Sequence, residues 1–261
     1  MQLNYHIVDA FAENVFSGNP AAVFILEDWL QDDVMQKIAI ENNLSETAFA
    51  VKAGDGYDLR WFTPEREIDL CGHATMATAY ILFNFFETSK TTLTFHTKFS
   101  GDLIVTKQGQ ILSMDFPSIM PAPTPILPEY EVAVGAKIKE AYLARDLFFL
   151  LDDESTVHQL KPDFSRLSKF ELGVGVIVTA PGQNIDFVSR TFFPKLTINE
   201  DPVCGSAHSN LIPFWSKRLK KAKMNATQLS ARGGQLMCEL AGSRVVIGGK
   251  AVLYAEATCY L

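Results

Sequence analysis

Two similar short stretches carry most of the residue types that could do chemistry. They are Asp69-Leu70-Cys71-Gly72-His73-Ala74-Thr75 and Asp201-Pro202-Val203-Cys204-Gly205-Ser206-Ala207-His208. In each, an aspartate precedes a Cys-Gly pair and the start of an apolar, helix-like run. A glycine at a strand-to-helix corner lets backbone amides approach a ligand, and the first amides of a helix are unpaired. Two such corners predict a clamp for a carboxylate at Gly72 and Gly205, although a purely steric role for each glycine is the alternative.

The acid–base candidates near these corners are few. They are Glu46, Asp69, His73, Asp201, Ser206 and His208. Glu46 stands out because the matching part of the second half, around Leu172-Gly173-Val174, has no carboxylate. Small and apolar neighbours would leave a buried Glu46 poorly solvated, and poor solvation brings a carboxylate towards the working range of a general base. A capping or surface role for Glu46 is equally compatible with its spacing.

The two corner cysteines, Cys71 and Cys204, allow other chemistry. As a thiol pair, one could take a proton from one face of a carbon while the other returns it on the opposite face. They could equally be small buried residues. Zinc bound by both cysteines with His73 and His208 is disfavoured, because the Cys-x-His and Cys-x₃-His spacings are not those of common structural zinc sites. These spacings give no reason to expect a metal. No Gly-x-Gly-x-x-Gly or Walker motif is present, so we do not expect a nucleotide cofactor either.

The similarity of the two halves extends beyond the corners. An Arg-x-Phe-x-Pro signature precedes each corner and a Gly-x-Leu turn follows it, starting at Arg60 and Gly101 in the first half and at Arg190 and Gly234 in the second. The arginines are 130 residues apart, and the glycines and the corner cysteines are 133 apart. A near-constant shift predicts two copies of one unit, with a site where the two Cys-Gly turns face each other.

Proline content suggests where one copy ends. Five of the 12 prolines lie between Pro117 and Pro128, and such a stretch is stiff and extended. We therefore predict an N-terminal lobe over residues 1–117, a linker over 118–128 and a C-terminal lobe over 129–254. The last segment, 255–261, could return to the first lobe. Residues 73–86 are apolar all round and predict a helix inside the first lobe, with residues 207–219 as its counterpart.

Composition limits the possible partners. The chain has 261 residues, 48% hydrophobic and 20% charged, with a net charge of −7. This is typical of a folded protein and argues against nucleic acid, which requires a basic face. No apolar run is long enough to span a membrane, and the first residues lack the features of a signal peptide. Four cysteines without framework spacing suggest free thiols in a reducing cytoplasm.

Many ordered motifs together resemble one family. They include Gly18-Asn19-Pro20-Ala21-Ala22-Val23, Asn43-Leu44-Ser45-Glu46-Thr47-Ala48-Phe49, Leu59-Arg60-Trp61-Phe62-Thr63-Pro64, both corners, and Gln228-x-Ser230-x-Arg232-Gly233-Gly234. The chain is similar over nearly its whole length to the phenazine-biosynthesis PhzF-like family. The resemblance implies the α+β diaminopimelate epimerase-like fold: two pseudo-symmetric lobes, each a barrel-like, mostly antiparallel sheet around a central helix, with the active site between them.

The resemblance also implies chemistry. Family members are cofactor-free, metal-free isomerases, usually homodimers, in which a glutamate moves a proton on a dihydro-hydroxyanthranilate ring. The matching base is Glu46, supported by His73, Asp201 and Ser206. The substrate would also be contacted around Asn19, Cys71, Gly72, Cys204 and Gly205.

One position departs from the family pattern. Cys204 stands where the family usually has threonine, and racemases of the same fold use a cysteine at both corners. His73, Ser206 and Glu46 nevertheless follow the PhzF-like pattern, which favours the glutamate. A two-cysteine racemase and a non-enzymatic acid-binding protein are the alternatives, and the substrate itself is not predicted.

Overall fold

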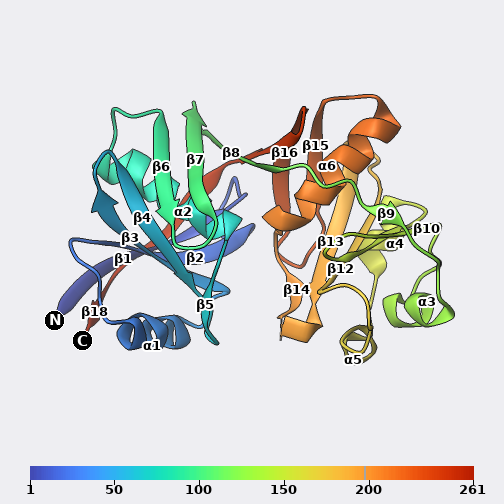
Figure 1. Cartoon of the computed structure of the whole chain (residues 1–261), viewed down its shortest axis with the longest axis horizontal. Coiled ribbons are helices and arrows are strands. Elements are labelled where there is room, and N and C mark those ends of the chain that lie inside the picture. The colour runs from blue at the N-terminus through green and yellow to red at the C-terminus, as the bar shows by residue number, and fades with distance from the viewer. Residues whose placement is uncertain (197) are drawn as a thin grey trace. The chain divides into compact units, whose positions relative to one another are not determined.

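The computed structural model describes residues 1–196 and 198–261. The chain forms two compact units, one from residues 1–115 with 248–261 and the other from residues 116–247 (Figure 1). The first and last strands of the chain therefore lie in the same unit.

The N-terminal unit is built around antiparallel and parallel strand pairs. Its elements are β1 (Gln2–Ala10), β2 (Asn19–Leu26), α1 (Asp32–Asn42), β3 (Glu46–Ala53), β4 (Gly56–Phe62), β5 (Glu67–Ile68), α2 (Gly72–Ile81), η1 (Leu82–Phe86), β6 (Thr92–Thr97), β7 (Gly101–Gln108), β8 (Ile111–Pro117) and β18 (Ala251–Tyr260). Strand β1 pairs with β18 and β2, β3 lies parallel to β2, and β4 pairs with β3, β5 and, in parallel, β6. Strand β7 lies between β6 and β8.

The C-terminal unit repeats this plan. Its elements are β9 (Ala122–Pro123), α3 (Pro128–Val134), β10 (Glu140–Leu143), β11 (Leu147–Leu150), α4 (Glu154–Gln159), α5 (Phe164–Leu167), β12 (Val176–Pro181), β13 (Phe187–Phe193), η2 (Pro194–Leu196), β14 (Ile198–Asp201), α6 (Gly205–Leu219), β15 (Lys223–Gln228), β16 (Gly234–Ala241) and β17 (Arg244–Gly249). Strand β10 pairs with β9 and β11, β12 lies parallel to β11, and β13 pairs with β12, β14 and, in parallel, β15. The order of antiparallel and parallel pairs from β9 to β15 is that of β18 and β1 to β6, so the structure contains the duplication that the sequence indicates.

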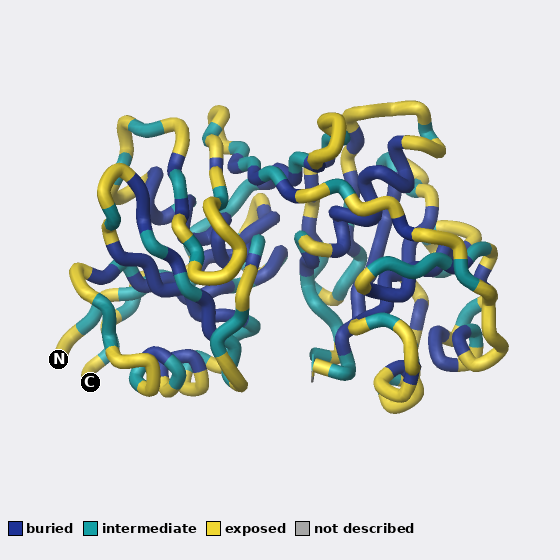
Figure 2. Tube along the Cα trace, in the orientation of Figure 1, coloured by how far each residue is buried: buried dark blue, intermediate teal, exposed yellow. Residues whose placement is uncertain are grey.

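Helices α2 and α6 are the core helices of their units. Of the ten residues of α2, eight are buried, and the helix packs against β1, β2, β3 and β18. In α6, ten consecutive residues from Ala207 to Ser216 are buried, and this helix packs against β15 and β16. Figure 2 shows these buried segments in dark blue inside each unit. Both helices begin directly after the corner cysteines, which places each Cys-Gly pair at a helix N-terminus.

The first core helix is shorter than predicted. It ends at Ile81, and Leu82–Phe86 forms one π-helical turn. Phe85 and Phe86 are 47% and 53% exposed, so the apolar run does not stay in the core. An all-apolar pattern has no polar face to show where the helix leaves the interior, which explains this error.

The predicted lobe bounds also need adjustment. Residues 118–128 belong to the C-terminal unit, where β9 pairs with β10, and are not a separate linker. The returning segment starts before residue 255, because β18 pairs with β1 from Ala251 onwards.

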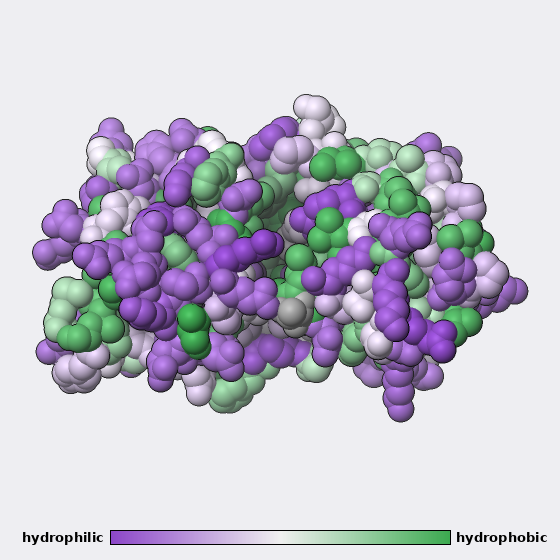
Figure 3. Space-filling view, turned by 60° about the horizontal axis from the view of Figure 1, so that its bottom comes forward, coloured by the Kyte–Doolittle hydropathy of each residue, from purple (hydrophilic) through white to green (hydrophobic). Residues whose placement is uncertain are grey.

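Hydrophilic side chains cover much of the face in Figure 3. No helix in the described part of the chain is long and apolar enough to span a membrane.

Candidate active site

Glu46 and His73 form a buried acid–base pair in the N-terminal unit. Glu46 opens β3 and is 8% exposed, and His73 lies in the first turn of α2 and is 6% exposed. Atom Nε2 of His73 lies 3.1 Å from Oε2 of Glu46. They form an ion pair when the ring is protonated, and neither atom has a further hydrogen-bond partner among the described residues. The pair thus contains polar atoms that are buried but still able to bind a ligand.

The other ring nitrogen of His73 meets two further candidates. Its Nδ1 atom lies 3.1 Å from Nδ2 of Asn19 and 3.5 Å from Sγ of Cys71. Asn19 opens β2, which lies parallel to β3, so the strand register brings it to the same end of the sheet as Glu46. The amide of Asn19 can donate to Nδ1 of a neutral ring, whereas a protonated ring would require the amide oxygen at this position.

Burial and neighbouring groups shift the pKa values of two residues in this cluster. Burial alone lowers the pKa of His73, but the adjacent Cys71 sulfur and Glu46 carboxylate outweigh burial and raise its pKa well above the usual value. Burial and the Glu46 charge raise the pKa of the Cys71 thiol. The raised pKa makes the Cys71 thiol a poor base at neutral pH, which leaves the Glu46 carboxylate, 3.1 Å from His73, as the base candidate of the cluster.

Glu46, Cys71 and His73 also offer metal-ligating atoms within 4.8 Å of one another. Cys71 lies at Nδ1 of the imidazole, whereas Glu46 lies at Nε2 on the other side of the ring. A metal bound by all three residues would require a different orientation of His73. The present arrangement is that of an imidazole held between two neighbours.

The second predicted corner is assembled in the C-terminal unit. Cys204 precedes the first turn of α6, and its Sγ atom lies 3.3 Å from Oγ of Ser206. Oδ1 of Asp201 accepts a hydrogen bond from the amide of Val203. Burial, and next the charge of Asp201, raise the pKa of the Cys204 thiol well above its usual value. The structure thus joins Asp201, Cys204, Gly205 and Ser206 in one corner, and Asn19, Glu46, Cys71, Gly72 and His73 in the other.

Two sequence candidates do not join these clusters. Asp69 is exposed, and its backbone carbonyl accepts a hydrogen bond from Ser100. His208 is fully buried, which lowers its pKa to about 4, and its Nδ1 atom lies 2.8 Å from the carbonyl oxygen of Cys204. His208 therefore stabilises the first turn of α6 from inside, and the suggested zinc set is not formed within this unit.

Three residues that sequence reasoning did not select as site residues support the second corner. Gln228 is fully buried; its Oε1 atom accepts from the Cys204 amide and its Nε2 atom donates to the carbonyl of Asp201. Arg145 donates from Nη2 to Oγ of Ser206 at 3.0 Å, and buried Asp146 holds Arg145 in place. The available signal was a charged Arg-Asp pair directly before the apolar run Leu147–Leu150.

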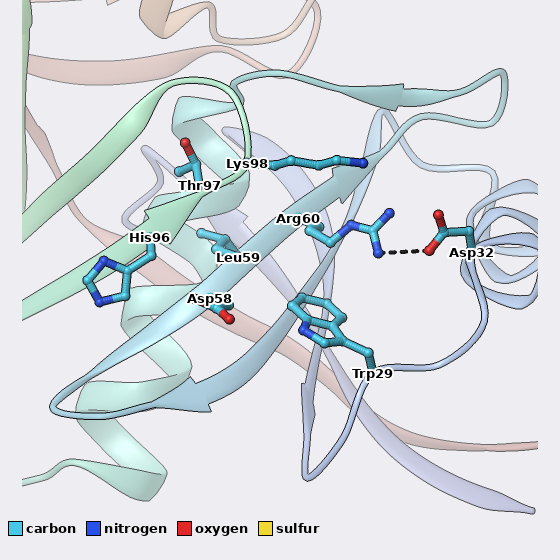
Figure 4. A pocket seen from close by; sticks show the side chains of 8 residues that line it. All are labelled: Trp29, Asp32, Asp58, Leu59, Arg60, His96, Thr97 and Lys98. Atoms are coloured by element: carbon cyan, nitrogen blue, oxygen red, sulfur yellow. Dashed lines mark hydrogen bonds and ion pairs between the residues drawn. The ribbon is translucent and has the colours of Figure 1, made fainter.

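A hollow of about 300 Å³ lies elsewhere in the N-terminal unit (Figure 4). Arg60 crosses it, donating to Glu67 through Nε and Nη2 and to Asp32 through Nη1. Nearby His96 is paired with Asp102 at 2.8 Å. These charged groups satisfy one another, so the hollow is better explained as the surroundings of a structural ion pair than as a binding site.

Comparison with known proteins identifies the family. A family model for phenazine biosynthesis-like proteins (PhzC-PhzF) matches residues 8–257. An uncharacterized isomerase of Pseudomonas aeruginosa is 48% identical over 261 residues, with complete coverage of both chains. An uncharacterized isomerase of Halalkalibacterium halodurans is 45% identical and covers 95% of this chain and 94% of its own length.

Solved structures agree with this assignment. A PhzF-family protein of Enterococcus faecalis shares 64% sequence identity, complete coverage of both chains and a TM-score of 0.99. A probable proline racemase of Agrobacterium radiobacter shares only the fold, with 11% identity, 99% and 93% coverage and a TM-score of 0.66. These matches confirm the two-lobed diaminopimelate epimerase-like fold. The chain belongs to the phenazine biosynthesis-like PhzF family and is an isomerase.

Proposed function

We propose that this isomerase moves a proton between carbons of a small carboxylate-bearing substrate without a cofactor, with Glu46 as the general base. The observation that carries the proposal is the buried Glu46 carboxylate, whose Oε2 atom has no hydrogen-bond partner among the described residues and lies 3.1 Å from His73. A carboxylate oxygen in this position can accept a proton from a ligand that binds beside it.

The proposed reaction requires no external reactant. The Glu46 carboxylate takes a proton from a substrate carbon, and the C–H electron pair moves into the adjacent unsaturated system. The carboxylic acid so formed returns the proton to a different carbon, which restores the carboxylate. Positioned acid–base groups of this kind contribute about 10²–10⁴-fold to a rate. His73, adjacent to Oε2, would stabilise the negative charge that develops on the substrate.

Substrate binding is assigned to the two helix N-termini. Amides in the first turns of α2 and α6, at Gly72 and Gly205, have no partner inside their helices and favour an anion. Asp201 and Ser206 would bind the polar groups of the substrate, with Asn19, Cys71 and Cys204 at its edges. The approach of the two corners in the working enzyme is part of the proposal, as are the homodimer and the cytoplasmic location.

The test is a screen of small cyclic carboxylic acids in deuterated water, read as mass gain. We expect a compound that gains deuterium with the wild-type protein and not with Glu46→Gln, while its binding is retained. Glu41→Gln, which changes an exposed carboxylate on α1, is the matched control and should exchange normally. Normal exchange by Glu46→Gln would refute the proposed mechanism.

A two-cysteine racemase is the second candidate. It is favoured by one observation, the cysteine that precedes each core helix at Cys71 and Cys204. It requires one thiolate, which the raised pKa values of both thiols oppose. Under this mechanism Cys71→Ser or Cys204→Ser would stop exchange while Glu46→Gln would not. The binding-protein alternative is superseded by the assignment as an isomerase.

A further inference from the structure

The Arg145 side chain is fixed beside the second corner. Its Nε and Nη2 atoms donate to Oδ2 of Asp146, at 3.0 and 2.7 Å. Asp146 is 1% exposed, and its Oδ1 atom accepts from the amide of Gly175. The backbone carbonyl of Arg145 accepts from the amide of Val174. A buried carboxylate that also accepts from a backbone amide therefore determines where the guanidinium points.

The guanidinium also sets the role of the Ser206 hydroxyl. Nη2 donates to Oγ of Ser206, so that oxygen acts as the acceptor and its proton remains available. Cys204 Sγ, at 3.3 Å, is the protein atom near this proton, and a neutral sulfur is a weak acceptor. A substrate oxygen would be a better acceptor. Arg145 thereby converts Ser206 into a hydrogen-bond donor towards a ligand.

The remaining end of Arg145 is unused. The Nη1 atom has no hydrogen-bond partner among the described residues, and half of the side chain, 51%, is exposed. One face of the guanidinium lies over the Phe193 ring, 5.5 Å from its centre. A planar donor held in position next to an available hydroxyl is the arrangement that recognises a carboxylate.

We infer that Arg145 is a substrate-binding residue, which grips a carboxylate of the substrate through Nη1 while Ser206 donates a second hydrogen bond. The inference rests on the proposed function, because it places the substrate at the Ser206 corner. It also narrows the substrate class to molecules with a carboxylate at the end that meets the C-terminal unit. In the N-terminal unit the equivalent position, read from the β2–β3 and β11–β12 registers, is Pro20, so recognition is provided by one unit only.

A pair of planar probes tests the inference without turnover. 3-Hydroxyanthranilate and 2-aminophenol carry the same amino and hydroxyl groups and differ only in the carboxylate. Binding of each is measured by NMR titration. Arg145→Lys keeps a positive charge opposite Asp146 but removes the planar guanidinium and its paired N–H donors. The double variant Arg145→Gln with Asp146→Asn removes both charges, so that no buried carboxylate is left unpaired. Arg166→Gln, an exposed arginine of α5 paired with Asp163, is the control.

We expect both Arg145 variants to bind 3-hydroxyanthranilate about 10- to 100-fold more weakly, the range for a lost hydrogen bond to a charged group. Their affinity for 2-aminophenol should not change, and Arg166→Gln should bind both probes normally. Equal loss for both probes, no loss for either, or no carboxylate-dependent binding to the wild-type protein would overturn the inference. Failure of the Glu46 mechanism is recognised separately, by deuterium exchange that persists in Glu46→Gln.

Discussion

Nε2 of His73 lies 3.1 Å from Oε2 of Glu46, and both side chains are almost completely buried. Few charged pairs are buried in this way, because the free energy needed to remove two ions from water usually exceeds the free energy gained from their attraction. Here both facing atoms also lack a hydrogen bond to the described residues. Burial of such a pair adds little to stability, and it supports the proposal that Glu46 and His73 take part in proton transfer.

The first prediction concerns pH. The pKa of His73 is raised above 6.5, so the pair contributes stability that is complete below about pH 6.5 and is lost as pH rises through the folded-state pKa. The difference in free energy of unfolding between the wild type and His73→Gln should therefore shrink from pH 6 to pH 9 in urea titrations. Activity should fall over the same alkaline range.

His158 supplies the control for this experiment, because it is exposed on α4 and lies outside the site. His158→Gln should follow the wild-type curve at every pH. A stability difference for His73→Gln that grows towards pH 9 would contradict the assigned ion pair.

The second prediction compares the two equivalent arginines. Arg190 is paired with Glu200 and also donates through Nη1 to the carbonyls of Val157 and Leu160. Arg60 is paired in the same way with Glu67, but its Nη1 atom bonds Asp32, which is 71% exposed. Arg190→Ala should therefore lose about 3–5 kcal/mol, the cost of breaking a buried pair. Arg60→Ala should lose clearly less.

Urea unfolding followed by circular dichroism measures both losses. The double variants Arg190→Ala with Glu200→Gln, and Arg60→Ala with Glu67→Gln, show how much of each loss comes from the carboxylate left behind. Equal losses for the two single variants would mean that the carbonyl contacts of Arg190 contribute nothing.

The duplication was predictable because both copies kept their signatures at a constant offset. The residue equivalent to Glu46 was predictable only in part. Thr47 in the first unit and Val176 in the second have equivalent positions in their strand pairs. The residue equivalent to Glu46 is therefore Gly175, which directly follows the segment 172–174 inferred from the sequence. That position has no carboxylate of its own, as expected, but its amide is bound by Asp146.

Sequence reasoning could not find this neighbour. Asp146 and Gly175 are brought together by the parallel pairing of β11 and β12, whose register is a property of the folded sheet. Asp146 in turn orients the guanidinium of Arg145, whose Nη2 atom donates to Ser206. Local patterns identify residues at a helix start, whereas contacts between distant segments depend on register and side-chain packing.

The third prediction concerns the thiols and separates the two mechanisms. Cys71, Cys204 and Cys238 are buried, and burial raises the pKa of each, whereas Cys259 is partly exposed on β18. The thiolate is the reactive form. Iodoacetamide at neutral pH should therefore modify Cys259 first, as peptide mass spectrometry would show, and one equivalent should leave deuterium exchange unchanged. The Cys259→Ser variant should keep full activity and react much more slowly, because only buried, neutral thiols remain.

Loss of exchange together with modification of Cys71 or Cys204 at one equivalent would instead establish a reactive thiolate at a corner and favour the racemase mechanism over the Glu46 mechanism.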